Sequence, residues 1–130
     1  LLLLTNDGEL ANRLTHPSYE IRKTYVARLH GEVKPGVRRR LLAGIELEDG
    51  PIAVDSFRLV DTYGDITTVE IVVHEGRNRL VRRMMEAVGY PVRELVRTGF
   101  GPISLDHLKQ GTTRRIKGNA LTALYGAVGL

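Results

Sequence analysis

The residues best suited to chemistry lie in one arginine-rich stretch, EGRNRLVRRMM, which runs from Glu75 to Met85. It predicts a helix over 78–88 whose apolar face carries Val81, Met84, Met85 and Val88 and whose charged face carries Arg79, Arg82, Arg83 and Glu86. Arginines in the first turn of a helix oppose its positive N-terminal dipole, and Arg79 and Arg83 repel each other as i, i+4 neighbours. A bound anion such as a phosphate would relieve both conflicts. The alternative is a solvated basic helix in which Arg82 pairs with Glu86.

Positive charge is unevenly distributed along the chain. The 19 basic residues, of which 15 are arginine, exceed the 15 acidic ones and give a net charge of +4. Residues 46–76 carry one basic and eight acidic side chains, whereas residues 77–97 carry six arginines and two glutamates. Because the planar arginine fork binds phosphates and stacks on bases, we expect one side of the molecule to face an anion, most commonly nucleic acid. A basic protein with solvated arginines is the alternative.

Length and composition exclude several classes of protein. The 130 residues are enough for a single domain, 1–130, with a hydrophobic core. Because there is no cysteine and the four histidines are scattered, we expect neither a disulfide framework nor a metal site. No apolar run is long enough to cross a membrane, so we expect a soluble, cytoplasmic protein. We expect its partner to be nucleic acid and not a membrane. Since the chain opens on leucine inside an apolar run, we also expect it to be a piece of a longer protein.

Periodicity and turn residues place the elements that must position these side chains. Helices are expected at 9–15, 37–43, 78–88 and 119–128, and strands at 1–4, 21–29, 53–62, 66–74, 92–97 and 113–116. Asp7 should cap the first helix, which turns Leu10 and Leu14 inward. The strict alternation of apolar and polar residues over 66–74 predicts an antiparallel hairpin with one buried face. The order of elements indicates an α/β or α+β domain built on a largely antiparallel mixed sheet flanked by short helices.

Motifs spread over essentially the whole chain resemble one family. LLLLTNDG at 1–8, His16-Pro17, KTY at 23–25, EGRNRLVRRM at 75–84, LVR at 95–97 and Gly101-Pro102 follow the order and spacing of bacterial ribosomal-RNA pseudouridine synthases of the RsuA/RluB type. The resemblance implies a pseudouridine-synthase-like core. It also implies an isomerase that converts a specific uridine of ribosomal RNA, here of the large subunit, to pseudouridine with no metal and no organic cofactor.

The resemblance further implies a mechanism and roles for individual residues. The target nucleotide is flipped out of its stack, an aspartate attacks it, the N-glycosidic bond breaks, and C5 of the turned base rejoins the ribose. Tyr25 matches the tyrosine that stacks on the uracil and assists proton removal from C5; the alternative is a core tyrosine on a central strand. Arg82 matches the arginine that pairs with the catalytic aspartate. The remaining candidates, all contacts to the RNA, are Lys23, Arg77, Asn78, Arg79 and Arg83.

The sequence departs from the family pattern in two places. Leucine stands at position 80, where the family usually has glutamine, and this removes a polar group near the site. The motif that carries the nucleophile, GRLDxxTxG, should lie just upstream of Leu1, and Asp7, the nearest acid, is expected to cap a helix instead. An S4-like RNA-binding domain is also expected upstream. Because the nucleophile is expected upstream, we expect these 130 residues to be inactive by themselves. We also expect a monomer. A domain that keeps the fold but only binds RNA or assists ribosome assembly is the alternative function.

Overall fold

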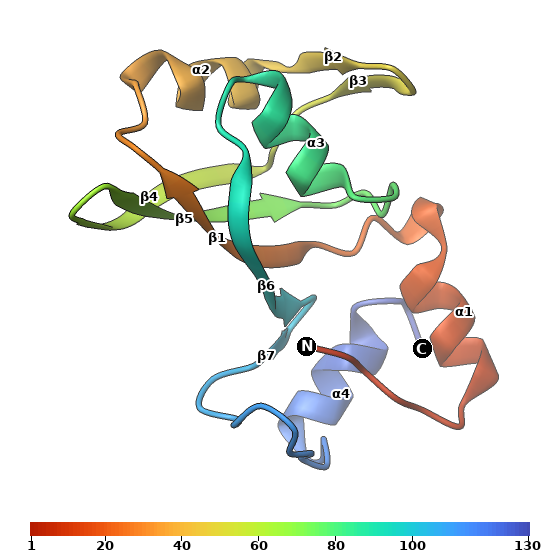
Figure 1. Ribbon diagram of the computed structural model, residues 1–130. Coiled ribbons are helices and arrows are strands. Elements are labelled where there is room, and N and C mark those ends of the chain that lie inside the picture. Colours follow the sequence, from red (N-terminus) through yellow and green to blue (C-terminus); the bar gives the residue numbers. More distant parts are fainter.

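The computed structural model describes all residues from Leu1 to Leu130 and has two lobes (Figure 1). The larger lobe is a five-stranded sheet with helices on one face, and the smaller lobe gathers both ends of the chain. In chain order, the elements are α1 (Gly8–Thr15), the 3-10 turn η1 (Pro17–Tyr19), β1 (Lys23–His30), α2 (Pro35–Ala43), β2 (Ile45–Leu47), β3 (Gly50–Ile52), β4 (Ser56–Tyr63), β5 (Ile66–Val73), α3 (Leu80–Ala87), β6 (Val92–Phe100), β7 (Ile103–Ser104) and α4 (Asn119–Gly126).

The sheet is antiparallel throughout, with the strand order β4-β5-β1-β6-β7. The alternation along β5 is as predicted, because the residues at odd positions from 67 to 73 are buried and those between them are only partly buried. The expected α+β class and the hairpin of β4 and β5 are therefore confirmed. None of the helices has the length and apolar character that crossing a membrane requires.

The hydrophobic core forms two clusters, one in each lobe. In the larger lobe, the predicted apolar face of α3 packs on β1 and β5, with Met84 and Met85 at most 1% exposed. In the smaller lobe, Leu10 and Leu14 of α1 pack against Leu124 of α4. Asp7 caps α1 as expected, accepting a hydrogen bond of 3.1 Å from the main-chain N–H of Leu10.

Two predicted strands do not form. Residues 1–4 are extended but unpaired, with Leu1 and Leu3 half-buried and Leu2 and Leu4 exposed, and residues 113–116 form no regular element. A strand requires a neighbouring backbone to pair with, and beyond β6 that place is taken by the short β7, which the sequence did not indicate. These two segments instead face each other across a hollow described below.

Other boundaries differ for local reasons. Helix α3 begins at Leu80 and not at residue 78, because Arg79 has left-handed backbone angles (φ 51°, ψ 34°) that helical residues do not adopt. Strand β6 continues through Gly99 to Phe100, although Gly99 was expected in a loop. The turn at Asp49-Gly50 closes a separate two-stranded hairpin, β2–β3, that was not predicted.

Candidate active site

Tyr25 lies at the centre of the sheet. It is on β1, between Ile71 of β5 and Arg97 of β6. Alternation along the strand puts it on the same face as Ala27 and Leu29, which are fully buried. The Tyr25 ring itself is only partly buried against the main cluster, so it lies where the core ends.

A bulge determines which residue of β6 stands opposite Tyr25. The register of β1 and β6 shifts between Thr24 and Tyr25, where Gly99 pairs with Thr24 and Arg97 pairs with Tyr25. A Cβ on Gly99 would lie 3.1 Å from Cβ and Oγ1 of Thr24, so glycine allows the close approach of the two strands here. Bulges commonly redirect side chains next to active sites. This one places the Arg97 side chain on the same face as Tyr25.

Arg97 is a site residue that sequence reasoning did not single out. Its Nε and Nη2 donate hydrogen bonds of 3.2 and 2.7 Å to the main-chain carbonyl of Leu1. Its guanidinium lies 5.0 Å from the centroid of the Phe100 ring. The only sequence signal was its place in the LVR motif. The register shift that brings Arg97 opposite Tyr25 leaves no recognisable pattern in the amino-acid sequence.

Lys23, one of the predicted RNA contacts, lies beside Arg97 and Phe100. Its Nζ lies 5.6 Å from the centroid of Phe100, which is its cross-strand partner. Burial, and then the positive charge of Arg97, lower the pKa of the Lys23 ammonium below its ordinary value. Tyr25, Lys23, Arg97 and Phe100 therefore form one group at the end of the β1–β6 face.

Arg82 lies on α3 and contacts the start of β6. It is half-buried, and its Nη1 donates a hydrogen bond of 3.3 Å to the carbonyl of Val92 at the start of β6. Val92 pairs with Leu29, four positions along β1 from Tyr25, which corresponds to about 13 Å of strand. The alternative pair with Glu86 does not form in the structure. Both predicted catalytic residues thus border β6, and no direct contact joins them.

Two of the predicted RNA contacts have acidic partners within the chain. Arg77 donates to Glu75 (Nε–Oε1 2.8 Å) and to the carbonyls of Gly50 and Pro51 at 3.1 and 2.7 Å. Arg83 donates to both carboxylate oxygens of Asp49, at 2.9 and 3.0 Å. These bonds fasten the β2–β3 hairpin to the start of α3. Hydrogen bonding from Arg83 lowers the pKa of Asp49 to about 2.

Asn78 and Arg79, the other two RNA contacts predicted in the arginine-rich stretch, are exposed in the turn before α3. The Arg79 side chain forms no ion pair. Four RNA contacts are predicted between residues 77 and 83. Of these, Asn78 and Arg79 are the two whose exposed side chains can bind a ligand.

Known proteins are similar to this chain over most of its length. The family model described as RNA pseudouridylate synthase matches residues 1–87. The chain belongs to the RNA pseudouridylate synthase family, in its RsuA/RluB type.

Two curated relatives and one solved structure are similar to this chain. An uncharacterised RNA pseudouridine synthase of Mycobacterium tuberculosis (strain ATCC 25618 / H37Rv) is 53% identical over 130 residues, which are 100% of this chain and 51% of that protein. The ribosomal large subunit pseudouridine synthase B of Bacillus subtilis (strain 168) is 45% identical over 118 residues, 89% of this chain and 48% of that protein. A pseudouridylate synthase crystal structure superposes with a TM-score of 0.83 and 30% identity, covering 92% of this chain and 52% of that one. The chain thus spans about half the length of the curated relatives it matches.

Leu80, the departure from the family pattern, is a core residue of the larger lobe. It is 5% exposed and belongs to the same apolar cluster as Val81 and Met84. The sequence predicted the loss of a polar group at this position, and the structure shows that an apolar contact takes its place at the start of α3.

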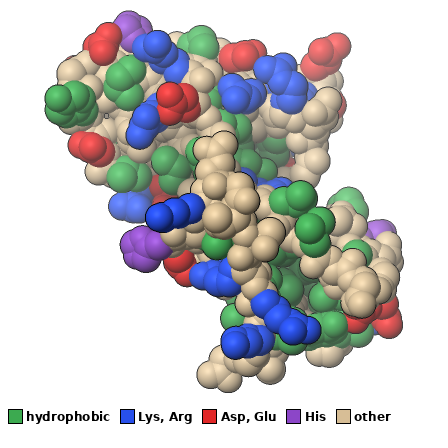
Figure 2. Space-filling model, turned by 60° about the horizontal axis from the view of Figure 1, so that its bottom comes forward, with side chains coloured by type: hydrophobic (Ala, Val, Ile, Leu, Met, Phe, Trp, Pro, Cys, Tyr) green, Lys and Arg blue, Asp and Glu red, His purple; other side chains and the backbone are tan.

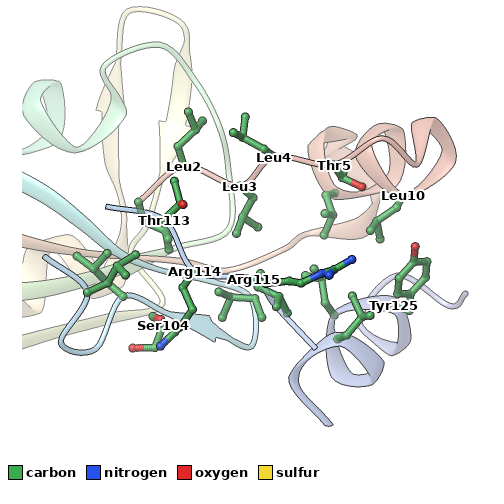
Figure 3. A pocket seen from close by; sticks show the side chains of 18 of the residues that line it. Leu2, Leu3, Leu4, Thr5, Leu10, Ser104, Thr113, Arg114, Arg115 and Tyr125 are labelled. Carbon is green, nitrogen blue, oxygen red and sulfur yellow. Dashed lines mark hydrogen bonds between the residues drawn. The ribbon is translucent and has the colours of Figure 1, made fainter. Parts of the chain in front are cut away.

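A hollow of about 480 Å³ lies in the smaller lobe, away from Tyr25 and Arg82 (Figure 3). Residues 1–6 form one wall and residues 112–116 face them, with α4 closing one side. Leu3 points into this space, whereas Leu2 and Leu4 point away from it. It meets the Tyr25 region only through Leu1, whose carbonyl Arg97 binds.

Proposed function

We propose that this protein isomerises a specific uridine to pseudouridine in ribosomal RNA, and that the RNA is that of the large subunit. Membership of the family supports the reaction, and the similarity to ribosomal large subunit pseudouridine synthase B supports the substrate. We also propose that residues 1–130 form a single fragment of the catalytic domain. The observation that carries the proposal is the half-buried Tyr25 on the central strand, flanked by the cations Lys23 and Arg97.

The proposed reaction moves one bond and one proton. The target nucleotide leaves its stack, and its uracil ring packs on Tyr25. An aspartate carboxylate attacks the nucleotide, the bond from C1′ of the ribose to N1 of uracil breaks, and the base turns. A bond from C1′ to C5 then forms, and the bond between the nucleotide and the aspartate breaks, which frees the carboxylate. The proton on C5 is removed with the help of the Tyr25 hydroxyl, and N1 ends protonated. No oxidant, reductant or second substrate is needed.

Arg82 is proposed to hold the nucleophilic aspartate in its ionised form. Its single bond to Val92, at 3.3 Å, leaves most of its five N–H donors for a carboxylate. An adjacent guanidinium lowers a carboxyl pKa, which keeps the nucleophile charged at neutral pH.

The 130 residues do not place a carboxylate for this role. Asp7 accepts from the Leu10 N–H and from the Tyr125 hydroxyl at 2.7 Å, and it is therefore committed to the junction of α1 and α4. We propose that the nucleophile belongs to the sequence before Leu1, as the resemblance implies, and that residues 1–130 bind RNA without converting it.

The test compares the 130-residue chain with the complete gene product that contains it. Each is incubated with large-subunit ribosomal RNA lacking its modifications, and pseudouridine is mapped by chemical labelling and primer extension. We expect one converted uridine with the complete product and none with the 130 residues. RNA binding without conversion by both proteins would favour the non-catalytic alternative. Conversion by the 130 residues would return Asp7 to consideration as the nucleophile.

A further inference from the structure

Helix α3 begins with more positive charge than its own residues neutralise. Arg79 is its N-cap, and Arg82 and Arg83 lie in its first turn, which contains no acidic residue. No side chain caps the helix either. Arginines at this end of a helix oppose the positive end of the helix dipole. An anion from another part of the molecule would therefore stabilise the start of α3.

The β2–β3 hairpin, which lies beside α3 (Figure 1), supplies such an anion in the carboxylate of Asp49. Nη1 and Nη2 of Arg83 donate to its two oxygens at 2.9 and 3.0 Å, the bidentate geometry that a guanidinium prefers for any carboxylate. The Nε of Arg83 donates to the carbonyl of Asn78 at 3.0 Å. All three nitrogens of the Arg83 guanidinium are thus bonded within the chain.

The neighbouring Arg82 points in another direction. Consecutive residues of a helix project about 100° apart, and Arg82 donates from Nη1 to the carbonyl of Val92 on β6 at 3.3 Å. It is the residue proposed above to hold the nucleophilic aspartate. A free guanidinium at position 83, one step along the helix, would attract the same carboxylate and compete with Arg82 for it.

We propose that Asp49 is a positioning residue for the isomerisation, and that it holds Arg83 aside so that the nucleophile pairs with Arg82 alone. This inference rests on the proposed function, because that function assigns the nucleophile to Arg82. Asp49 acts through Arg83 and does not touch the reacting nucleotide. Since hydrogen bonding from Arg83 lowers the pKa of Asp49 to about 2, the carboxylate is charged at the neutral pH of catalysis.

Turnover of the complete gene product at saturating RNA tests this role, with kcat measured as pseudouridine formed at the mapped uridine. We expect Asp49→Asn to lower kcat about tenfold, because the released Arg83 draws the nucleophile out of place. Adding Arg83→Gln removes the competitor, so the double variant should turn over about fivefold faster than Asp49→Asn. Saturating RNA separates kcat from any loss of RNA affinity that follows removal of an arginine.

A merely structural role predicts a different result. If Asp49 only anchored the hairpin, Asp49→Asn and Arg83→Gln would break the same bond, and the double variant would be no faster than Asp49→Asn. Both side chains of the pair are partly exposed, so each variant should still fold. We expect the urea midpoint of the double variant to be no higher than that of Asp49→Asn, so that recovered turnover does not reflect recovered stability.

A matched variant controls for charge. Glu46→Gln removes a carboxylate from an exposed position of the same hairpin, where it has no ion-pair partner, and should leave kcat unchanged. A tenfold loss of kcat in Glu46→Gln would show that any negative charge on the hairpin has the same effect, and would overturn the specific role of Asp49.

The remaining outcomes separate the two proposals. If Asp49→Asn turns over as fast as the wild type, or if the double variant is no faster than Asp49→Asn, the positioning role is overturned, while conversion by the wild type still supports the proposed function. If the wild-type complete product converts no uridine, the proposed function fails and the positioning role fails with it.

Discussion

Arg83 and Asp49 form a bidentate ion pair, with Nη1–Oδ1 at 2.9 Å and Nη2–Oδ2 at 3.0 Å. The pair joins α3 to the turn of the β2–β3 hairpin across 34 positions of sequence. Arg77 reaches the same carboxylate at 3.4 Å. The arginines that look most available for a ligand in the sequence are therefore partly used to hold the hairpin against the helix.

Acid should weaken this junction in a defined pH range. The pKa of Asp49 is lowered from 3.8 to about 2, first by the hydrogen bond from Arg83. Since the folded-state pKa is the lower one, the ionised pair contributes its full stability above the unfolded-state value and loses it as the pH falls through about 2. Asp49→Asn should lower the urea midpoint at neutral pH, and its difference from the wild type should vanish in strong acid. Asp61→Asn, on the exposed side of β4, is the control and should leave the neutral-pH midpoint unchanged.

The hydroxyl of Tyr25 should matter for turnover and not for binding. Tyr25→Phe keeps the ring that stacks on the base but removes the group proposed to assist proton transfer from C5. In the complete gene product, we expect turnover to fall about a hundredfold or more, with RNA affinity and unfolding midpoint near those of the wild type. Tyr63→Phe makes the same change on a side chain that is 85% exposed and should be neutral. An unchanged rate for Tyr25→Phe would leave that residue with stacking and packing alone.

Leu80 should tolerate an apolar substitute but not the glutamine usual in the family. Its side chain is 5% exposed among apolar neighbours, so Leu80→Gln should lower the free energy of unfolding by about 2 kcal/mol. Leu80→Met nearly conserves volume and should cost about 1 kcal/mol or less. Urea denaturation measures both. Equal stability of the leucine and glutamine forms would show that a polar partner is within reach of position 80.

Of the two arginines before α3, we expect Arg79 to contribute to RNA binding and Arg77 to the stability of the fold. Arg79→Asn removes an exposed charge and keeps a residue that accepts the left-handed backbone, so it should lower the log–log salt slope of RNA binding by about 0.7 to 0.9. Its free energy of unfolding should stay within about 0.5 kcal/mol of the wild type. Arg77→Gln releases the hairpin carbonyls and should lower the unfolding midpoint. The reverse assignment, with stability lost at position 79 and the slope changed only at 77, would contradict this division.

Local patterns predicted much of the fold because they depend on neighbours along the chain. The buried face of α3, with Val81, Met84 and Met85, follows from helical spacing, and the buried face of β5 follows from strict alternation. The left-handed glycine after α3, Gly89 at φ 90°, was equally readable from the sequence.

What could not be predicted depends on partners distant in the sequence. The leucines at 1–4 have strand-forming composition, but no free backbone lies beside them. Arg83 gains its acidic partner only because the β2–β3 hairpin carries Asp49 to α3. Arg97 stands opposite Tyr25 only because the strands slip past each other at Gly99.

Contacts between neighbouring elements of the chain and contacts between its two ends lie in different lobes of the molecule. A space-filling view shows two lobes joined by a narrower middle, with lysine and arginine side chains on both (Figure 2). The larger lobe is built from elements that follow one another along the chain, whereas the smaller lobe brings α1 to α4.

The bond between Tyr125 and Asp7 has a consequence for the order in which the protein acquires its shape. It closes a loop of 118 positions, and Arg13 closes another of 115 by donating to the carbonyl of Val128. Long loops carry the largest closure entropy and delay folding. During synthesis, the sheet lobe can form as soon as β6 leaves the ribosome, but α1 must wait, with its leucines uncovered, until α4 follows. Helix α1 is thus buried late although it is made before the sheet, and its apolar face stays exposed until α4 has been synthesised.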